Sequence, residues 1–480
     1  MRTLLTLAFV VIGFGLFAQN NMLKSDTKAY INPIFQGDYP DPSILRDGED
    51  YYMVHSSFIY YPGLLIWHST DLVNWEPVSN ALQTVVGSVW APELVKYEGK
   101  YFIYFPADGT NYVITADRIE GPWSEPKELK VNMIDPGHVV DENGNRYLYF
   151  SSGSYVPLTK DGLSVAGDIV HSYDGWEIPR DWSIECFCME GPKLFKRGDY
   201  YYLTVAEGGT AGPATGHMVI SARSKSPLGP WENSPFNPVL RAKSNQDKWW
   251  SVGHGTIFDD GKGQWYMVFH GYEKDYYTMG RQTMLVPVEW TKDGWFKIPE
   301  TVALEKSIPL PNLKNKIKEP FEFSDSFHGT VLKPHWKFFG SYEPDRIAFE
   351  NRGLVVAGKG STVADCSPML CIPADHVYTA EVELELEGDA IGGLVLFYNE
   401  KAFSGILADS ANVLANLRGW QFPTVPDRID RHVFLRLKNI HNTVDMYYSL
   451  NGKDWTKIEN SFEASAYHHN VLSGFMSLRI

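Results

Sequence analysis

One pattern recurs five times between residues 33 and 300, and it limits the possible folds more than any other feature of the chain. Each copy has a turn with Gly or Asp and then a strand that opens on an aromatic residue, and the copies are spaced about 50 residues apart. The strands begin at Tyr51, Tyr101, Tyr147, Tyr200 and Trp265. Five such copies predict a five-bladed β-propeller, with one four-stranded sheet per copy around a central channel. An open sandwich gives no reason for the pattern to recur.

The composition agrees with an all-β fold. Aromatic residues make up 14% of the chain, and 41 Gly and 29 Pro supply the turns that join short strands. The net charge of −15 disfavours nucleic acid and acidic membrane surfaces as partners, because both carry charge of the same sign. Sugars suit this chain better, because their apolar C–H faces stack on aromatic rings.

Each repeat carries a short motif about ten to twelve residues ahead of its aromatic strand. The motifs are Asp41-Pro42, Ala91-Pro92, Asp135-Pro136, Glu190-Gly191-Pro192 and Gly253-His254-Gly255. Because the innermost strands of propeller blades line the axis, we expect the three acids and His254 to converge in the central channel. Asp-Pro is also a common turn dipeptide, but three acids in register favour chemistry over a purely structural role.

Two further acids compete for a place in this pocket. Glu93 lies just past its motif position, and Glu207 follows its aromatic strand, so we expect Glu207 toward the opposite end of the blade. Paired carboxylates without a nucleophile, nucleotide or metal motif fit glycoside hydrolysis. In that reaction one acid protonates the leaving oxygen and another activates water or attacks carbon.

Longer segments around the motifs are distinctive as a set. They include YPDPSILRDGEDYYMVHSSF (39–58), SVWAPELVKYEGKYFIYF (88–105), MIDPGHVVDENGNRYLYF (133–150), MEGPKLFKRGDYYYLTVAEGG (189–209) and GRQTMLVPVEWTKDGW (280–295). Together and in this order they resemble glycoside hydrolase family 43, in particular its exported β-xylosidase-like members. The resemblance implies a five-bladed propeller and hydrolysis with inversion of the anomeric configuration.

The resemblance also implies roles for the three acids. Asp41 would be the general base that holds the attacking water, and Glu190 would be the general acid. Asp135 would orient Glu190 and keep its pKa high, because a nearby anion favours the protonated form. An inverting mechanism places base and acid roughly 6.5–9.5 Å apart.

Four more residues match binding positions of the family. Arg281 would bind sugar hydroxyls beside the base, and Phe58 and Trp90 would stack on the substrate. His254 would contact the site directly or help to hold a cation. We expect that cation to be calcium, bound through water and oxygen ligands and not required for the chemistry. The structural alternatives are a surface arginine, two core aromatics and a histidine buried for packing.

The implied activity is exo-acting release of pentose from xylan-derived oligosaccharides, and a β-xylosidase is the first hypothesis. Ile134 stands where many β-xylosidase relatives carry an aromatic residue, which leaves an α-L-arabinofuranosidase or a bifunctional enzyme open. An endo-arabinanase and a non-catalytic carbohydrate-binding propeller are further alternatives. The three acids argue against the last, because sugar binding does not require a protonated acid beside two anions. Linkage preference and oligomeric state do not follow from the sequence.

The regions outside the repeats predict export and a second domain. Residues 1–18 combine one arginine, an apolar run and a small residue at Ala18, which predicts a signal peptide and a periplasmic or extracellular protein. No later segment is apolar for long enough to span a membrane, so we expect no membrane insertion. The predicted domains are a propeller at 30–300, a linker at 301–319 and a β-sandwich at 320–480. The sandwich resembles the concanavalin-like, jelly-roll domain of family 43 xylosidases.

The four cysteines form two pairs along the sequence. Cys186 and Cys188 are expected to lie too close along one strand to bridge, so we predict packed thiols. Cys366 and Cys371 could close a small disulfide in an oxidising compartment. Neither pair has the further Cys or His spacing of a zinc site.

Overall fold

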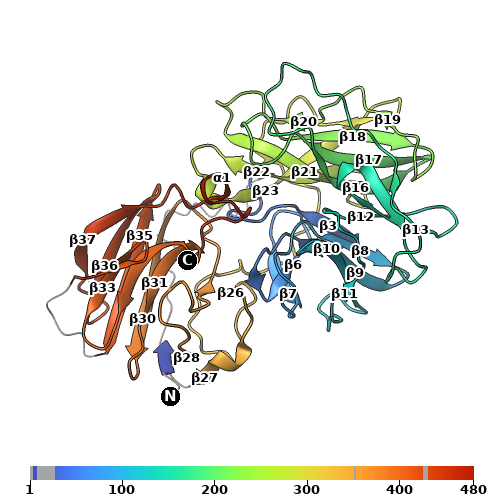
Figure 1. Ribbon diagram of the computed structural model, residues 1–480. Coiled ribbons are helices and arrows are strands. Elements are labelled where there is room, and N and C mark those ends of the chain that lie inside the picture. The colour runs from blue at the N-terminus through green and yellow to red at the C-terminus, as the bar shows by residue number, and fades with distance from the viewer. Residues whose placement is uncertain (1–3, 8–27, 351–352, 425–430) are drawn as a thin grey trace. The chain divides into compact units, whose positions relative to one another are not determined.

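The computed structural model describes residues 4–7, 28–350, 353–424 and 431–480, which form two compact units (Figure 1). The N-terminal unit holds residues 28–275 and 281–320, and the C-terminal unit holds residues 4–7, 276–280, 321–350, 353–424 and 431–480. Strands dominate both units, which confirms the all-β class. The helical segments of the described chain are α1 (His469–Leu472), η1 (Ser151–Gly153), η2 (Tyr277–Met279) and η3 (Pro344–Arg346).

Five antiparallel sheets make up most of the N-terminal unit, and each uses strands in their order along the sequence, with β5 left out of the first sheet. The first contains β3 (Ser43–Asp47), β4 (Asp50–Val54), β6 (Gly63–Ser69) and β7 (Glu76–Leu82). The second contains β8 (Glu93–Tyr97), β9 (Lys100–Ala107), β10 (Thr110–Ala116) and β11 (Lys127–Glu128). The third contains β12 (Gly137–Val140), β13 (Arg146–Phe150), β14 (Ser154–Pro157) and β15 (Val170–His171).

The fourth and fifth sheets follow the same order of strands. The fourth contains β16 (Met189–Arg197), β17 (Tyr200–Glu207), β18 (Met218–Ser224) and β19 (Glu232–Asn233), with β20 (Leu240–Arg241) also paired to β18. The fifth contains β21 (Trp249–Asp259), β22 (Trp265–Glu273), β23 (Arg281–Trp290) and β24 (Phe296–Lys297). The aromatic residues of the five sequence repeats thus begin or lie near the start of the second strand of each sheet.

The first strands of the five sheets contact one another in a closed cycle. Strand β3 contacts β8, β8 contacts β12, β12 contacts β16, β16 contacts β21, and β21 contacts β3. Neighbouring sheets also share apolar cores, as where Phe102 and Tyr104 of β9 pack in one cluster with Leu148 and Phe150 of β13. The cycle brings together the segments that lead into the first strands, and these segments carry the polar motifs.

Three short strands complete the N-terminal unit. Strand β2 (Ala29–Tyr30) pairs with β25 (Ile308–Pro309), and β5 (Tyr60–Tyr61) follows the first motif. Strand β25 lies within residues 301–319, the predicted linker. The backbone N–H of Lys316, in the same segment, donates a hydrogen bond to Thr70 Oγ1 at 2.9 Å. The segment therefore belongs to the N-terminal unit.

Two larger sheets form the C-terminal unit. One has the order β27 (Ile347–Glu350), β28 (Gly353–Ala357), β1 (Leu4–Leu7), β30 (Val377–Leu386), β35 (His432–Ile440), β36 (Thr443–Ser449) and β37 (Thr456–Glu463). The other has the order β31 (Gly392–Asn399), β32 (Ala402–Ala408), β33 (Val413–Leu417) and β34 (Trp420–Pro423). Strand β26 (Lys337–Phe339) pairs with β29 (Met369–Leu370).

The two sheets of the C-terminal unit contribute to one apolar core. In β30 every second residue is buried, so Val382 and Leu384 face the core while the glutamates between them face outward. Leu396 and Ile406 come from the smaller sheet and Leu435 from the larger one, and all three belong to the same cluster. Alternation along the strands thus accounts for the way the core is assembled.

The structure corrects the prediction for Cys186 and Cys188. These residues form a disulfide with Cα atoms 5.2 Å apart, within the usual range for a bridge. The prediction assumed an extended strand, but the chain bends at Phe187 and strand β16 begins only at Met189. Cys366 and Cys371 are free thiols.

Most of the predicted signal peptide, residues 8–18, lies outside the described residues. Leu4–Leu7 are described as strand β1. The signal peptide and export of the chain therefore stay predictions. Within the part of the chain that the structure describes, no helix is long and apolar enough to cross a membrane.

Candidate active site

Three acids and one histidine of the predicted set lie together in the N-terminal unit. His254 lies between the carboxylates: its Nδ1 is 3.4 Å from Asp41 Oδ1, and its Nε2 is 3.7 Å from Asp135 Oδ2. The same Nε2 is 3.4 Å from Glu190 Oε1. Asp41, Asp135 and His254 are buried, whereas the side chain of Glu190 keeps 18% of its surface exposed. Glu190 is therefore the acid most open to solvent.

The backbone at the motifs explains why these side chains converge. Asp41, Asp135 and His254 all have φ in the left-handed region, at 57°, 58° and 52°. The corresponding residue in the fourth sheet is Gly191, with a φ of 58°, so Glu190 enters the site from the preceding position. A left-handed conformation costs a residue other than glycine about 1 kcal/mol or more. Three such residues in one place are typical of a functional site.

Asp41 is held as a carboxylate. Its Oδ1 accepts a hydrogen bond from Arg281 Nη1 at 2.9 Å, and its Oδ2 accepts one from Ser56 Oγ at 2.5 Å. Burial by itself would raise the pKa of Asp41, but the positive charges of Arg281 and His254 hold that pKa well below its usual value. A buried, ionised carboxylate with fixed partners can take a proton from a water molecule.

Asp135 and Glu190 titrate together. Burial raises the pKa of Asp135 to about 7, and the negative charges of Glu190 and Asp41 add to this rise while His254 opposes it. Burial also acts to raise the pKa of Glu190, but hydrogen bonds from His217 and His254 bring it well below its usual value. A proton held near neutral pH is therefore favoured on Asp135. Because the two carboxyls interact, that proton belongs to the pair.

His254 offsets part of the negative charge. Burial by itself would lower the pKa of His254, but Asp41, Glu190 and Asp135 together raise it to about 9. The imidazole is therefore a cation at neutral pH. A buried charge is tolerated when it is paired, so this cation explains how three acids can lie close together inside the unit.

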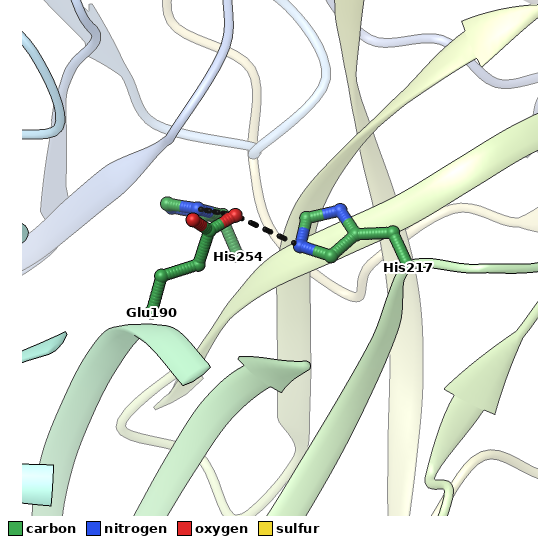
Figure 2. A group of neighbouring side chains, drawn as sticks. All are labelled: Glu190, His217 and His254. Atoms are coloured by element: carbon green, nitrogen blue, oxygen red, sulfur yellow. Dashed lines mark hydrogen bonds and ion pairs between the residues drawn. The ribbon is translucent and has the colours of Figure 1, made fainter. Parts of the chain in front are cut away.

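Two buried histidines that the sequence analysis did not single out complete the site. His217, just ahead of β18, places its Nε2 3.3 Å from Glu190 Oε1 (Figure 2). His270, on β22, accepts a hydrogen bond at Nδ1 from the Asp41 N–H at 3.0 Å. Burial lowers the pKa of His270 well below its usual value, so this ring is neutral.

Neither histidine lies in a motif ahead of an aromatic strand, so the repeat pattern did not predict their place in the site. Each histidine stands beside a glycine in the sequence, as His254 does. A Cβ atom on Gly253 would lie 2.1 Å from the His217 ring, so the ring occupies the space that this glycine leaves. A glycine next to a histidine in the sequence could therefore have identified both residues as candidates for the site.

The predicted binding residues occupy different positions. Phe58 is buried, and the guanidinium carbon of Arg281 lies 5.9 Å from the centre of its ring. Both residues therefore lie beside the predicted base. Trp90 is half-buried, and its indole N–H donates a hydrogen bond to Ser88 Oγ at 2.9 Å. Trp90 follows Val89, whose backbone pairs with Phe58, so it lies one step farther along the same segment.

The two rival acids have other partners. The prediction that Glu207 lies toward the opposite end of the blade is wrong, because β16 and β17 are antiparallel and Glu207 pairs with Met189, next to Glu190. Glu93 forms a buried ion pair with Lys193, whose Nζ lies 2.5 Å from Glu93 Oε2, and this pair joins the second and fourth sheets. Glu207 Oε1 accepts a hydrogen bond from the Trp176 N–H at 2.8 Å. Burial raises the pKa of Glu207 to about 7. These contacts favour structural roles for both acids.

Glu190, His217 and His254 can be tested as metal ligands. Their donor atoms all lie within 4.8 Å of one another, and Figure 2 shows both imidazoles directed at the carboxylate. Calcium takes about six to eight oxygen ligands, whereas two of these three donors are nitrogen atoms. The group therefore does not fit calcium as a direct ligand set. Calcium held through water beside His254 stays a prediction.

Comparison with known proteins places the chain among carbohydrate-active enzymes. The model for Glycosyl hydrolases family 43 matches residues 30–296. A non-reducing end alpha-L-arabinofuranosidase, BoGH43B, from Bacteroides ovatus is 32% identical over 363 residues, which cover 68% of this chain and 64% of that relative. A beta-xylosidase from Bacillus subtilis is 28% identical over 510 residues, which cover 92% of this chain and 93% of the relative.

A solved structure extends the similarity to both units. The crystal structure of the family 43 protein BlXynB from Bacillus licheniformis matches with a TM-score of 0.82 and 28% sequence identity. The match covers 94% of this chain and 95% of that one. The match to the arabinofuranosidase, in contrast, spans less than two thirds of that relative's length.

Proposed function

The chain belongs to glycosyl hydrolases family 43, and we propose that it is an exo-acting, inverting β-xylosidase that releases pentose from xylan-derived oligosaccharides. The family match and the xylosidase relatives support a glycosidase. The observation that carries the proposal is the grouping of Asp41, Asp135 and Glu190 around His254. Two poised acids and one charge modulator are what hydrolysis of a glycosidic bond requires.

Asp41 is the proposed general base. It is ionised at neutral pH, and Arg281 and Ser56 fix both of its oxygens. A water molecule beside Asp41 can give up a proton to the carboxylate while its oxygen attacks the anomeric carbon from the face opposite the leaving group. Fixed partners keep the carboxylate from rotating away during this step.

Glu190 is the proposed general acid. It is the most exposed of the three acids, so it can reach the leaving oxygen of a sugar that enters from solvent. A bound sugar displaces water from Glu190, which raises the pKa of this carboxyl and draws the shared proton from Asp135. The anionic Asp135 then stabilises the proton on Glu190 until the leaving oxygen takes it.

The spacing of these two residues bears on the stereochemistry of the reaction. One ring nitrogen of His254 lies 3.4 Å from Asp41 and the other lies 3.4 Å from Glu190. The ring width and the two contacts set an upper limit of about 9 Å on the separation of these carboxylate oxygens. Inverting enzymes use about 6.5–9.5 Å and retaining enzymes about 5–5.5 Å, so the configuration of the first product decides between the two reactions.

We also propose the finer architecture and the setting of the enzyme. The closed cycle of five sheets supports a five-bladed propeller, and the single core shared by two sheets supports a β-sandwich in the C-terminal unit. The apolar start of the sequence supports export to the periplasm or the extracellular space. A water-held calcium ion beside His254 would be an electrostatic aid and not the source of the nucleophile.

An α-L-arabinofuranosidase is the second candidate. The relative BoGH43B carries that name, and Ile134 replaces the aromatic residue expected beside Asp135 in many β-xylosidases. A smaller aliphatic side chain there leaves a different wall for a five-membered sugar ring. Both candidates use the same three acids, so only the pocket wall separates them.

The test is to assay the purified protein on nitrophenyl β-xyloside, nitrophenyl α-arabinofuranoside and xylobiose. We expect the highest kcat/KM on the two xylosides and α-xylose as the first product seen by proton NMR. First appearance of β-xylose would contradict inversion. Preference for the arabinofuranoside would select the second candidate, and inactivity on all three substrates would contradict the proposed function.

A further inference from the structure

The triad of Glu190, His217 and His254 has the dimensions of a transition-metal site. The Oε1 atom of Glu190 is 3.3 Å from His217 Nε2 and 3.4 Å from His254 Nε2 (Figure 2). Zinc binds nitrogen and oxygen ligands at about 2.0–2.2 Å, so neighbouring ligand atoms of a tetrahedral ion lie about 3.3–3.6 Å apart. The two observed separations match that edge length, and the third, between the two histidine nitrogens, is within 4.8 Å.

The two imidazoles are held in place before any ion arrives. His217 is fully buried, and its ring fills the space that Gly253 leaves by having no side chain. His254 stacks on His270 with ring centroids 4.9 Å apart. Little side-chain entropy is therefore lost when these two ligands bind an ion.

The third ligand provides the route of entry. The side chain of Glu190 is 18% exposed, while those of the two histidines are almost fully buried. An ion from solvent would meet the carboxylate first and then the two nitrogens behind it. Three protein ligands leave a fourth position of a tetrahedron for water.

The donor set selects the kind of ion. Two imidazole nitrogens with one carboxylate suit zinc, cobalt, nickel or copper, whereas calcium and magnesium prefer oxygen ligands. This preference separates the triad from the water-held calcium site expected beside His254. The transition-metal site and the calcium site would both include His254, but they would bind their ions through different kinds of ligand.

We propose that Glu190, His217 and His254 bind a divalent late transition-metal ion such as zinc, and that this ion inhibits the glycosidase. Its effect on activity rests on the proposed function, because the ion occupies the oxygen of Glu190 that must carry the proton to the leaving group. Zinc and oligosaccharide then compete for the same enzyme form. The binding itself depends on the three side chains. His254 must release to solvent the proton that it carries at neutral pH, so zinc affinity should rise as the pH rises.

Isothermal titration of the full-length protein with zinc chloride and, separately, calcium chloride tests the site. We expect one zinc ion per chain, no displacement of zinc by a hundredfold excess of calcium, and release by EDTA. Cobalt chloride should give the intense visible absorption of a tetrahedral ion. Equal affinity for zinc and calcium, or no zinc binding, would overturn the proposal.

Matched histidine variants locate the ion. His217→Gln should weaken zinc binding by at least about 100-fold, because it removes one of three protein ligands. His171→Gln should leave zinc binding unchanged, since His171 is exposed on β15 and pairs with Asp174. Equal loss in both variants, or none in His217→Gln, would overturn the proposed ligands. Glu190→Gln provides a second ligand variant should His217→Gln not fold.

A separate experiment measures the kinetics of xylobiose hydrolysis with and without zinc. We expect zinc to raise the apparent KM with kcat unchanged, and EDTA to restore the original value. Inhibition that lowers kcat at saturating substrate would contradict competition for Glu190. Absence of glycosidase activity without zinc would contradict the proposed function, while the titration still decides whether the metal site exists.

Discussion

The two units of this protein use buried space in opposite ways. In the N-terminal unit the residues that meet where the five sheets come together are ionisable, including Asp41, Asp135 and His254. In the C-terminal unit the space between two sheets is filled by apolar side chains such as Leu384 and Leu435. Buried ion pairs contribute little net stability compared with apolar packing. The comparison indicates that apolar packing stabilises the second centre, while the ionisable groups of the first contribute little to stability.

Local backbone conformation produces this difference. Strand β30 alternates buried and half-exposed residues without interruption, so its inner face is apolar throughout. The motifs of the N-terminal unit interrupt the extended chain with left-handed residues at Asp41, Asp135 and His254. These turns direct polar side chains inward at points where strand alternation alone would not.

The largest expected effect is loss of activity when the acid or the base is neutralised. Glu190→Gln should lower kcat/KM on xylobiose by roughly 10²–10⁴-fold but much less on the nitrophenyl xyloside, because nitrophenolate leaves without a proton. Asp41→Asn should lower the rate by a similar factor on both substrates, since both need an activated water. Steady-state kinetics on the two substrates checks this.

Glu207→Gln is the matched control for that experiment. Glu207 is also a buried glutamate, but its carboxyl contacts Trp176, so the variant should keep wild-type activity on both substrates. A dependence on the leaving group in Glu207→Gln and not in Glu190→Gln would move the acid to Glu207. Such a result would also remove the contrast between the two units.

A core substitution in the C-terminal unit should lower stability and leave activity unchanged. Leu435 is fully buried, and Leu435→Ala should lower the free energy of unfolding by about 2–5 kcal/mol through lost burial and a cavity. Urea unfolding measures the loss, and kcat of the folded variant should stay unchanged. Leu450→Ala is the control, because this leucine is 47% exposed and should cost well under 1 kcal/mol. A core variant as stable as this control would contradict the packing argument.

Glu207 should make stability depend on pH. Burial raises its pKa to about 7 from the usual value of 4.5, so the folded state binds more protons than the unfolded state between these values. Stability therefore falls as pH rises through this window, by up to about 3 kcal/mol. Glu207→Gln should remove that fall and be the more stable protein at pH 8. Melting temperatures from pH 4 to pH 8 test this, and parallel curves for the two proteins would contradict it.

The smallest expected effect is a shift in the pH profile of the enzyme. In the wild type, Asp135 and Glu190 together hold a proton up to a pKa of about 7, so activity on xylobiose should fall above that pH. Asp135→Asn leaves Glu190 beside His217 and His254, which lower its pKa. The alkaline limb of kcat/KM should then move down by about one pH unit. A limb that stays in place would show that Asp135 does not modulate the acid.

Much of the fold and the core of the site could be predicted from local sequence. The five aromatic repeats predicted successive sheets, and equivalent motif positions predicted that Asp41, Asp135, Glu190 and His254 would meet. These predictions succeed because strands and turns are specified by short stretches of sequence. Equivalent positions of the repeats then occupy equivalent positions in the fold.

The remaining features depend on contacts between distant segments. His217 and His270 reach the site from strands or loops outside the motifs. The Cys186–Cys188 bridge depends on a bend at Phe187 that strand patterning did not predict. Residues 276–280 lie between two strands of the fifth sheet in sequence, yet they group with the C-terminal unit.

The sequence by itself determined which groups meet at the centre of the N-terminal unit, because residue type and repeat position are local properties. Only the tertiary structure decided which of them are charged. Packing of distant segments places Arg281 against Asp41 and two histidines against Glu190, and burial strengthens each of these interactions. The pKa of a buried group depends on neighbours that are distant in sequence, so the preferred position of the shared proton follows from packing and not from the order of residues.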